Sequence, residues 1–352
     1  MMRNLMRLTF VGGLGLIVVL LTAPTDACGC GAVIPLEGDA GVEKETALIR
    51  WLDGVEDIVM QLDVEGTSKE AAWILPVPAP ASVKLGDPKL FDALAELTKP
   101  IVQPTYEFLP MISGAGAPPP PGGSAVTLLT RQTLGPFDVS TLAESDANAL
   151  SDWLKANGYV FPAKLAPVLR PYVEQGWFYV AVKLAPAGRG ETLTGALDPL
   201  WLTFESDQII YPMRPVMLAP GDLPMLLYVL AEHRVDHPKD RTRSFDTQMP
   251  FADWIDPQSL TENSPLTPFV MRRVFLTKFE DRIYAPQDID YDFVFTFAPN
   301  DETYRTVVYE SRGMAAFAGV PVFIWVCCIL PVGLLLAMIS LRKRKKRAPA
   351  RA

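Results

Sequence analysis

The sequence predicts an α+β protein with a mainly antiparallel sheet and a few helices, followed by one C-terminal transmembrane helix. Two observations lead to this prediction. Many short apolar runs, separated by turn residues, lie among only a few helical patterns. Near the end of the chain, residues 313–341 form a stretch of 29 residues without a charge, which is long enough to cross a bilayer.

The first 27 residues have the parts of a secretory signal peptide. Two arginines give a positive start, residues 8–21 form an apolar run, and small residues near Ala27 suit cleavage. The alternative, a first transmembrane helix, needs about 20 apolar residues, and this run is shorter. We therefore expect residues 1–27 to be removed and residues 28–312 to form an exported domain.

Two cysteines, Cys28 and Cys30, lie in the expected exported domain. In an oxidising compartment we expect them to form a small disulfide, and the alternative is a pair of thiols for a soft metal such as copper or zinc. If cleavage follows Ala27, Cys28 becomes the mature N terminus and could instead carry a lipid. Thr25 stands where lipidated sequences usually have leucine.

Residues 46–66 predict a β-hairpin whose turn is Asp53-Gly54. The next stretch, "EAAWILPVPAP" at residues 70–80, begins as a buried strand and ends in alternating prolines. Because Pro76, Pro78 and Pro80 supply no N–H group, we expect an edge strand that leaves the sheet in extended form. A solvated ligand for a polyproline-binding domain is the alternative.

Helix signals occur in residues 87–99, 145–158 and 165–177. Asp87 caps the first segment, Asn157-Gly158 ends the second, and prolines are expected to kink or restart the third. Between the first two, "SGAGAPPPPGGSA" at residues 113–125 is a proline- and glycine-rich loop. It is either a long surface loop in one fold or a linker between two domains.

Six further segments have the composition of β-strands. They are residues 177–186, 197–206, 207–218, 225–235, 272–281 and 290–299. No period of 20–50 residues is evident, so the chain is not a repeat array.

Several stretches carry a resemblance to a known family. They are the cysteine at the expected mature start, "AAWILPVPAP", "LFDALAELTKP", "GPFDVSTLAESDANALSDWLKANGY", "PYVEQGWFYVAVKLAP" and "LDPLWLTFESDQIIYPMRPV". Together with the signal-plus-anchor layout, they resemble the bacterial domain of unknown function 2330 family over most of residues 28–300. The resemblance implies a bacterial, exported and membrane-attached protein, and it carries over no catalytic residue. The opening "CGCG" is shorter than the cysteine-flanked segment typical of the family.

The basic cluster "RKRKKR", residues 342–347, directly follows the apolar stretch. Such a cluster is costly to translocate, so residues 342–352 are predicted to be a cytoplasmic tail with residues 28–312 outside. The whole chain has a net charge of −8, and because nine basic residues but one acidic residue lie at the two ends, residues 28–312 carry about −16. This acidity excludes a nucleic-acid partner, which requires a basic face.

The chain has two histidines, His233 and His237, in the stretch "EHRVDHPKD". Their spacing suits a zinc site on a helix, but Pro238 and the strand-like composition favour surface or loop positions. Residues 288–292, "DIDYD", resemble the start of a calcium loop but lack its glycine, and we expect the polar face of an edge strand. Signatures of serine nucleophiles and phosphate-binding glycine loops are absent.

The sequence therefore predicts a bacterial single-pass membrane protein with an acidic extracytoplasmic domain. We expect this domain to bind a protein or glycan of the cell envelope, or to serve there structurally, without a cofactor. The alternative is an envelope hydrolase or metal-dependent enzyme that uses His233 and His237.

Overall fold

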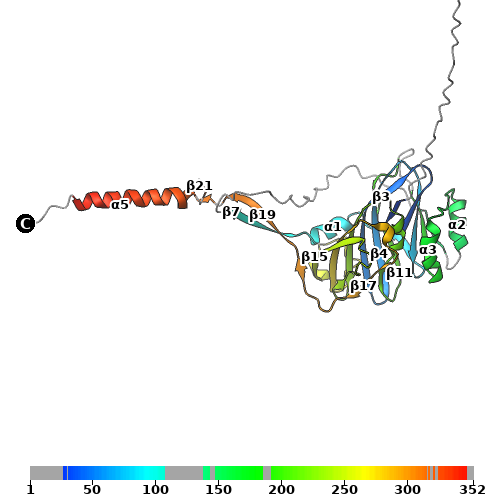
Figure 1. Cartoon of the computed structure of the whole chain (residues 1–352). Helices are drawn as coiled ribbons and strands as arrows, with labels where there is room; N and C mark the ends of the chain where they lie inside the picture. The colour runs from blue at the N-terminus through cyan, green and yellow to red at the C-terminus, as the bar shows by residue number, and fades with distance from the viewer. Residues whose placement is uncertain are drawn as a thin grey trace, which may run out of the picture.

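The computed structural model is an α+β fold of two large β-sheets with helices on their outer faces and one long C-terminal helix (Figure 1). It describes residues 27–29, 31–107, 138–142, 147–184, 192–314, 316–317, 320–321 and 324–346. The predicted fold class is confirmed.

The larger sheet has nine strands. In order they are β18 (Tyr304–Arg305), β15 (Phe245–Ile255), β16 (Val274–Ile283), β13 (Leu223–Ala231), β3 (Ala40–Leu52), β4 (Val55–Gly66), β11 (Leu200–Glu205) and β6 (Ser82–Leu85), with β10 (Gly195–Ala196) also paired to β4. All neighbours are antiparallel except β13 and β3, which run parallel. The predicted hairpin is β3–β4, and its turn residues Asp53 and Gly54 have φ values of 56° and 77°, the left-handed pair that a tight hairpin favours.

The smaller sheet has five antiparallel strands. In order they are β1 (Ala27–Gly29), β2 (Gly31–Pro35), β5 (Ala71–Val77), β9 (Phe178–Leu184) and β8 (Asp138–Leu142). Its inner face packs against the larger sheet, so that Trp73 and Val180 from one sheet share a core with Ile49 and Val229 from the other. Chain segments on both sides of residues 113–125 contribute to this core, while residues 113–125 themselves lie outside the described part of the chain.

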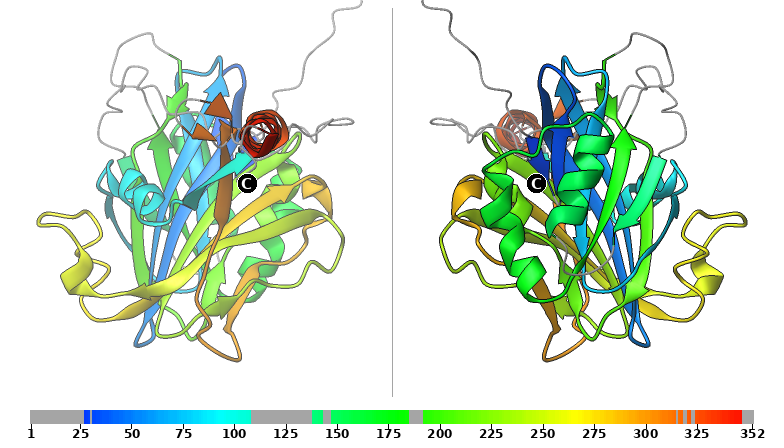
Figure 2. Two further views of the ribbon diagram at one scale, coloured as in Figure 1. Left: turned by 90° about the vertical axis from the view of Figure 1, so that its left-hand side faces the viewer. Right: turned by 90° about the vertical axis from the view of Figure 1, so that its right-hand side faces the viewer.

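Helices cover the outer faces of the two sheets. Helices α2 (Ala147–Ala156) and α3 (Leu165–Glu174) lie over the smaller sheet (Figure 2) and bury Leu154 and Leu165 against it. Helix α1 (Leu90–Leu97) and the loop that contains Phe269 cover the larger sheet. Because both sheets are buried on both faces, strands such as β5 read as unbroken apolar runs.

The proline-rich strand β5 differs from the prediction of an edge strand. It pairs with β2 through residues 71–74 and with β9 along its whole length, so it is an inner strand over its first half. The ladder with β2 ends at Ile74, and Pro76 lies beyond it, in the half of β5 that pairs on one side only. Pro78 and Pro80 follow the strand and carry the chain toward α1.

Two other predicted strands are wrong in part. In residues 207–218, only β12 (Ile209–Tyr211) is extended, and a 3₁₀ turn η1 (Arg214–Leu218) follows because Pro215 starts it. In residues 288–299, the strand β17 (Phe293–Phe297) begins only after the aspartates. It joins β12 and β14 (Val235–Asp236) in a three-stranded sheet. Two further 3₁₀ turns are short: η2 (Pro257–Ser259) follows β15, and η3 (Pro286–Asp288) precedes β17 and contacts η1.

Asp292 explains why the expected polar strand face does not form. Its Oδ1 accepts hydrogen bonds from the Met213 N–H at 2.8 Å and from the Tyr172 hydroxyl at 2.5 Å, and Arg214 Nε lies 3.3 Å from Oδ2. The carboxylate therefore joins α3, η1 and the start of β17 rather than facing solvent.

A two-stranded parallel ribbon leads from the two sheets toward the C-terminal helix (Figure 1). It consists of β7 (Ile101–Glu107) and β19 (Val307–Met314), and the short strands β20 (Ala316–Phe317) and β21 (Val320–Pro321) follow. The predicted transmembrane helix, 313–341, starts too early, because its first residues are extended.

Within the described residues, one helix is long and apolar enough to cross a membrane, over Trp325–Lys343. It begins with a π-helical turn, η4 (Trp325–Ile329), and continues as α5 (Leu330–Lys346). Its 19 residues span about 28 Å, close to the thickness of the hydrocarbon core.

Candidate functional site

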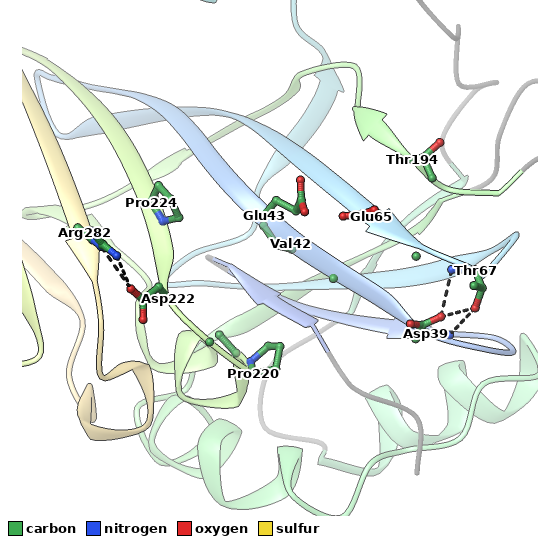
Figure 3. Close-up of a pocket in the computed structure, with 14 residues that line it drawn as sticks. Asp39, Val42, Glu43, Glu65, Thr67, Thr194, Pro220, Asp222, Pro224 and Arg282 are labelled. Carbon is green, nitrogen blue, oxygen red and sulfur yellow. Dashed lines mark hydrogen bonds and ion pairs between the residues drawn. The ribbon is translucent and has the colours of Figure 1, made fainter. Parts of the chain in front are cut away.

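An acidic cleft of about 960 Å³ lies at one end of the larger sheet, where β3 begins and β4 ends (Figure 3). The loop before β13 closes its other side. Its lining includes these residues: Asp39, Val42, Glu43, Glu65, Asp222 and Arg282. We call this hollow the acidic cleft. A neighbouring hollow of about 570 Å³ shares Glu43 and Glu65 with it, so these two side chains stand between the two cavities.

A β-bulge places Glu43 beside Glu65. In the β3–β4 ladder, Val42 pairs with Val64 and Lys44 with Asp63, so Glu43 has no partner of its own. A bulge of this kind turns one side chain out of the regular alternation, and bulges often lie next to functional sites. Figure 3 shows the Glu43 and Glu65 carboxyl groups facing each other.

The two carboxyl groups interact although both residues are exposed. Hydrogen bonding to Glu65 and repulsion from its charge raise the pKa of Glu43 above its usual range, and Asp63 adds to the repulsion. Burial raises the pKa of Asp63 too, and Lys44 offsets part of that effect. Two carboxyl groups in this arrangement hold one proton between them more readily than isolated groups do.

Fixed polar groups stand at the two sides of the acidic cleft. At one side, hydrogen bonds from the Thr67 hydroxyl and backbone N–H to Asp39 lower the pKa of that carboxyl. At the other side, Arg282 donates to Asp222 at 2.9 Å. Because the one arginine that lines the cleft is neutralised by Asp222, the remaining charge comes from Asp39, Glu43 and Glu65.

This arrangement suits a positively charged organic group. Apolar surface from Val42, Pro220 and Pro224 lies beside the carboxylates and can contact an alkyl chain. Among the described residues, no group of three or more histidine, cysteine, aspartate or glutamate side chains is placed to hold a metal ion. The acidic cleft can therefore bind a cation by charge and by apolar contact without coordination geometry.

The structure gives the two predicted metal-binding histidines different surroundings. His233 is exposed, and its Nδ1 lies 2.8 Å from Oδ2 of Asp301. His237 is buried, with Nε2 at 3.0 Å from Asp281 Oδ2 and Nδ1 at 2.9 Å from the Pro238 carbonyl. Four phenylalanine rings surround His237: Phe245, Phe279, Phe293 and Phe295.

The contacts of His237 indicate a structural role. Its two ring nitrogens contact the Pro238 carbonyl and the Asp281 carboxylate, which join the segment after β14 to β16. Metal binding by His233 and His237 stays a prediction. The same holds for a Cys28–Cys30 disulfide, because Cys30 lies outside the described residues and only the backbone of Cys28 is described.

Sequence reasoning did not find the residues of the acidic cleft. Glu43 and Glu65 look like ordinary solvent-facing residues of a hairpin, and Asp222 and Arg282 lie far from them in the chain. One weak signal exists, since "GVEKE" at residues 41–45 places polar side chains at three successive positions where a regular strand alternates.

Comparisons with known proteins give one family match. The model of a family described as "Uncharacterized protein conserved in bacteria (DUF2330)" matches residues 24–296. No curated protein matches the sequence. Among solved structures, the crystal structure of baculovirus P35 is similar with a TM-score of 0.34 and 10% sequence identity, over 76% of this chain and 99% of that chain. The family match runs from before β1 into β17 and so includes the acidic cleft.

Proposed function

The chain belongs to the DUF2330 family of uncharacterised bacterial proteins, and from this membership and the acidic cleft we propose that it is a membrane-anchored binding module for cationic ligands. In this proposal residues 1–27 are a cleaved signal peptide and residues 28–312 are the exported domain. The apolar helix holds the protein in the cell membrane as a single span, and residues 342–352 remain in the cytoplasm. The cluster of basic residues directly after the apolar helix supports this orientation.

The pairing of Glu43 with Glu65 carries the proposal. Repulsion between the two carboxylates makes it unfavourable for both to be ionised at once, so Glu43 holds a proton more readily. A bound ammonium group would supply the compensating positive charge and so replace that proton. Binding of a cation should therefore release a proton. Apolar contact with Val42, Pro220 and Pro224 would favour an alkylammonium group over a small inorganic cation.

The proposed ligand class is an alkylammonium group, carried by a polyamine or by lysine side chains of an envelope protein. Both sources present the same chemistry to the cleft. A ligand of this class would find the cleft on the outer side of the membrane, where the domain is proposed to lie. The field of an acidic domain also attracts cations before contact is made.

Calorimetric titration of the full-length protein in detergent with spermidine tests the proposal. We expect saturable binding that weakens with salt and tightens as the pH rises through the range in which Glu43 loses its proton. The double variant Glu43→Gln, Glu65→Gln should bind about tenfold more weakly or worse, because it removes both charges.

Glu262→Gln is the matched control for the single cleft variant Glu43→Gln, because each removes one carboxylate and Glu262 is exposed and does not line the acidic cleft. It makes the same chemical change without touching the site. Equal losses of affinity in the control and in the cleft variant would show that only the overall charge attracts spermidine, and the proposed site would be rejected. A lysine-rich peptide in a second titration separates a peptide ligand from a free polyamine.

The alternative of a hydrolase or metal-dependent enzyme based on His233 and His237 has less support. Asp281 and the Pro238 carbonyl already occupy both ring nitrogens of His237, and the ring is buried. His233 is exposed, and one of its ring nitrogens contacts Asp301.

A further inference from the structure

A row of four rings lies at the end of the larger sheet opposite the acidic cleft. The ring row consists of Trp51 at the end of β3, Phe297 at the end of β17, His233 after β13 and Trp254 near the end of β15. Successive ring centroids are 6.2, 5.6 and 6.5 Å apart, and the neighbouring ring planes are inclined at 63°, 84° and 74°. The rings therefore meet edge to face, and a ligand would stack on individual rings rather than on one flat platform. Phe297 is 45% exposed, and the other three rings are exposed at least in part.

Three of the four rings are held in place by a contact outside the row, and Phe297 packs between two of them, Trp51 and His233. The Trp51 indole N–H donates to the Ser206 carbonyl at 2.8 Å, Asp301 holds His233, and Arg273 lies over Trp254 at 4.6 Å from its centroid. Asp301 is itself fixed by the Arg234 backbone N–H at 2.9 Å. Rings that are held before a ligand arrives lose little conformational freedom on binding.

Polar groups that can contact hydroxyls border the ring row. Arg272 donates to Glu232 at 2.8 Å and to Asp53 at 3.2 Å, and these two acidic residues adjoin His233 and the end of β3 in sequence. The Nε2 of His233 has no hydrogen-bond partner among the described residues, because Asp301 occupies only Nδ1. Donors and acceptors therefore lie together along the edge of an apolar strip.

We propose that the ring row is a binding site for a neutral saccharide chain. A pyranose ring has an apolar face of C–H groups that stacks on aromatic rings, and its equatorial hydroxyls each donate and accept hydrogen bonds. The ring row supplies the first kind of contact, while Glu232, Arg272 and His233 Nε2 supply the second. Charged residues of both signs border the row, which favours an uncharged ligand over an anionic one.

This site is separate from the acidic cleft and does not depend on the proposed function. The two sites share no residue and occupy opposite ends of strands β3 and β13. A protein partner could also use tryptophan and arginine as anchors. The mixture of half-exposed rings with prearranged hydroxyl partners favours the saccharide.

Titration calorimetry of the full-length protein with cellotetraose and with the tetramer of N-acetylglucosamine tests this inference. We expect at least one of them to bind saturably, and Phe297→Ala to weaken that binding by about tenfold or more. Glu232→Gln should weaken it through lost hydroxyl contacts while leaving the rings in place. Tyr284→Ala, which truncates an exposed aromatic residue away from the ring row, should bind like the unchanged protein.

Two results would overturn the inference. One is the absence of saturable binding to either oligosaccharide. The other is binding that survives in both Phe297→Ala and Glu232→Gln. The double variant in the acidic cleft should leave saccharide binding unchanged, so failure at one site is distinguishable from failure at the other.

Discussion

Asp57 shows how this fold keeps a charge inside a sheet. Its carboxylate accepts hydrogen bonds from Arg50 at 2.6 Å, from the Trp201 indole at 2.8 Å and from the Thr203 hydroxyl at 2.6 Å. Arg50 also donates to the Phe269 carbonyl at 3.1 Å, which ties the covering loop to β3. A buried ion pair is tolerated when its remaining hydrogen-bonding capacity is filled in this way.

The neighbouring Glu56 has fewer hydrogen bonds to offset the cost of burying its carboxyl group. It is fully buried, and burial raises its pKa well above the usual range, while hydrogen bonds from the Ile210 N–H and Ser206 offset only part of the effect. A carboxyl whose pKa is raised by folding holds its proton over a pH range in which the unfolded chain has lost it. Stability therefore falls as the pH rises through that range.

We predict that Glu56→Gln stabilises the protein at pH 8. The amide is neutral and keeps an acceptor for the Ile210 N–H, so the gain should be roughly 1–3 kcal/mol, the range for a poorly compensated buried polar group. Urea unfolding followed by tryptophan fluorescence at pH 5 and pH 8 measures it. The difference between variant and unchanged protein should grow with pH, and a difference that is equal at both pH values would contradict the explanation.

At the scale of elements, the start of β2 depends on the absence of a side chain. Gly31 has φ of +119°, and a Cβ there would lie 2.6 Å from Trp73 Nε1, 2.7 Å from Leu75 Cδ2 and 2.8 Å from the Ile74 carbonyl. Trp73 is fully buried in the core between the two sheets. The close approach of β2 to β5 therefore requires glycine at this position.

We predict that Gly31→Ala destabilises the fold by roughly 1–3 kcal/mol or more through overpacking, in addition to the cost of its backbone conformation. Gly54→Ala is the matched control, because Gly54 also has positive φ (+77°) but has no atom within 4 Å of the added Cβ. Urea unfolding of both variants separates the two effects. Equal losses would mean that backbone strain alone matters at residue 31.

At the scale of the whole molecule, charge and apolar surface are strongly separated. Residues 28–312 carry an excess of acidic residues, whereas basic residues are concentrated in the last eleven positions, 342–352. Between them lies a helix whose side chains make no buried contact with the rest of the described chain. This separation matches the polarity of a single membrane span.

We predict that the full-length protein stays in the membrane fraction after a high-salt wash and needs detergent for extraction. A chain that ends at residue 312 should be recovered in the soluble fraction, because it lacks the apolar helix. Protease added to intact cells should leave the basic tail uncut. Recovery of the full-length protein without detergent would refute the span, and cleavage of the tail would refute the orientation.

Much of this architecture could be predicted from local sequence. The β3–β4 hairpin followed from Asp53-Gly54, α1 from the residues after Asp87, and the end of α2 from Gly158, whose φ is +85°. The family and the apolar helix could also be predicted from the sequence. These features depend on neighbouring residues or on the length of an apolar run, and such information is present in any window of the chain.

The errors came from contacts between distant segments. Strand β5 is an inner strand over its first half because β2 pairs with it there. Asp292 is turned inward because η1 lies beside it, and the apolar helix starts late because the residues before it pair as short strands. The acidic cleft and the ring row are further examples, since each collects side chains from strands far apart in sequence.

The sequence by itself determined the class of fold, the order of its main elements, the charge of each region and the apolar span near the C terminus. Only the tertiary structure decided which carboxylates meet at Glu43, which ring nitrogens of the two histidines are occupied, and which rings share a surface. The physical reason is that propensity and hydrophobicity act over a few residues, whereas a binding site is made by the packing of strands whose register no single segment encodes.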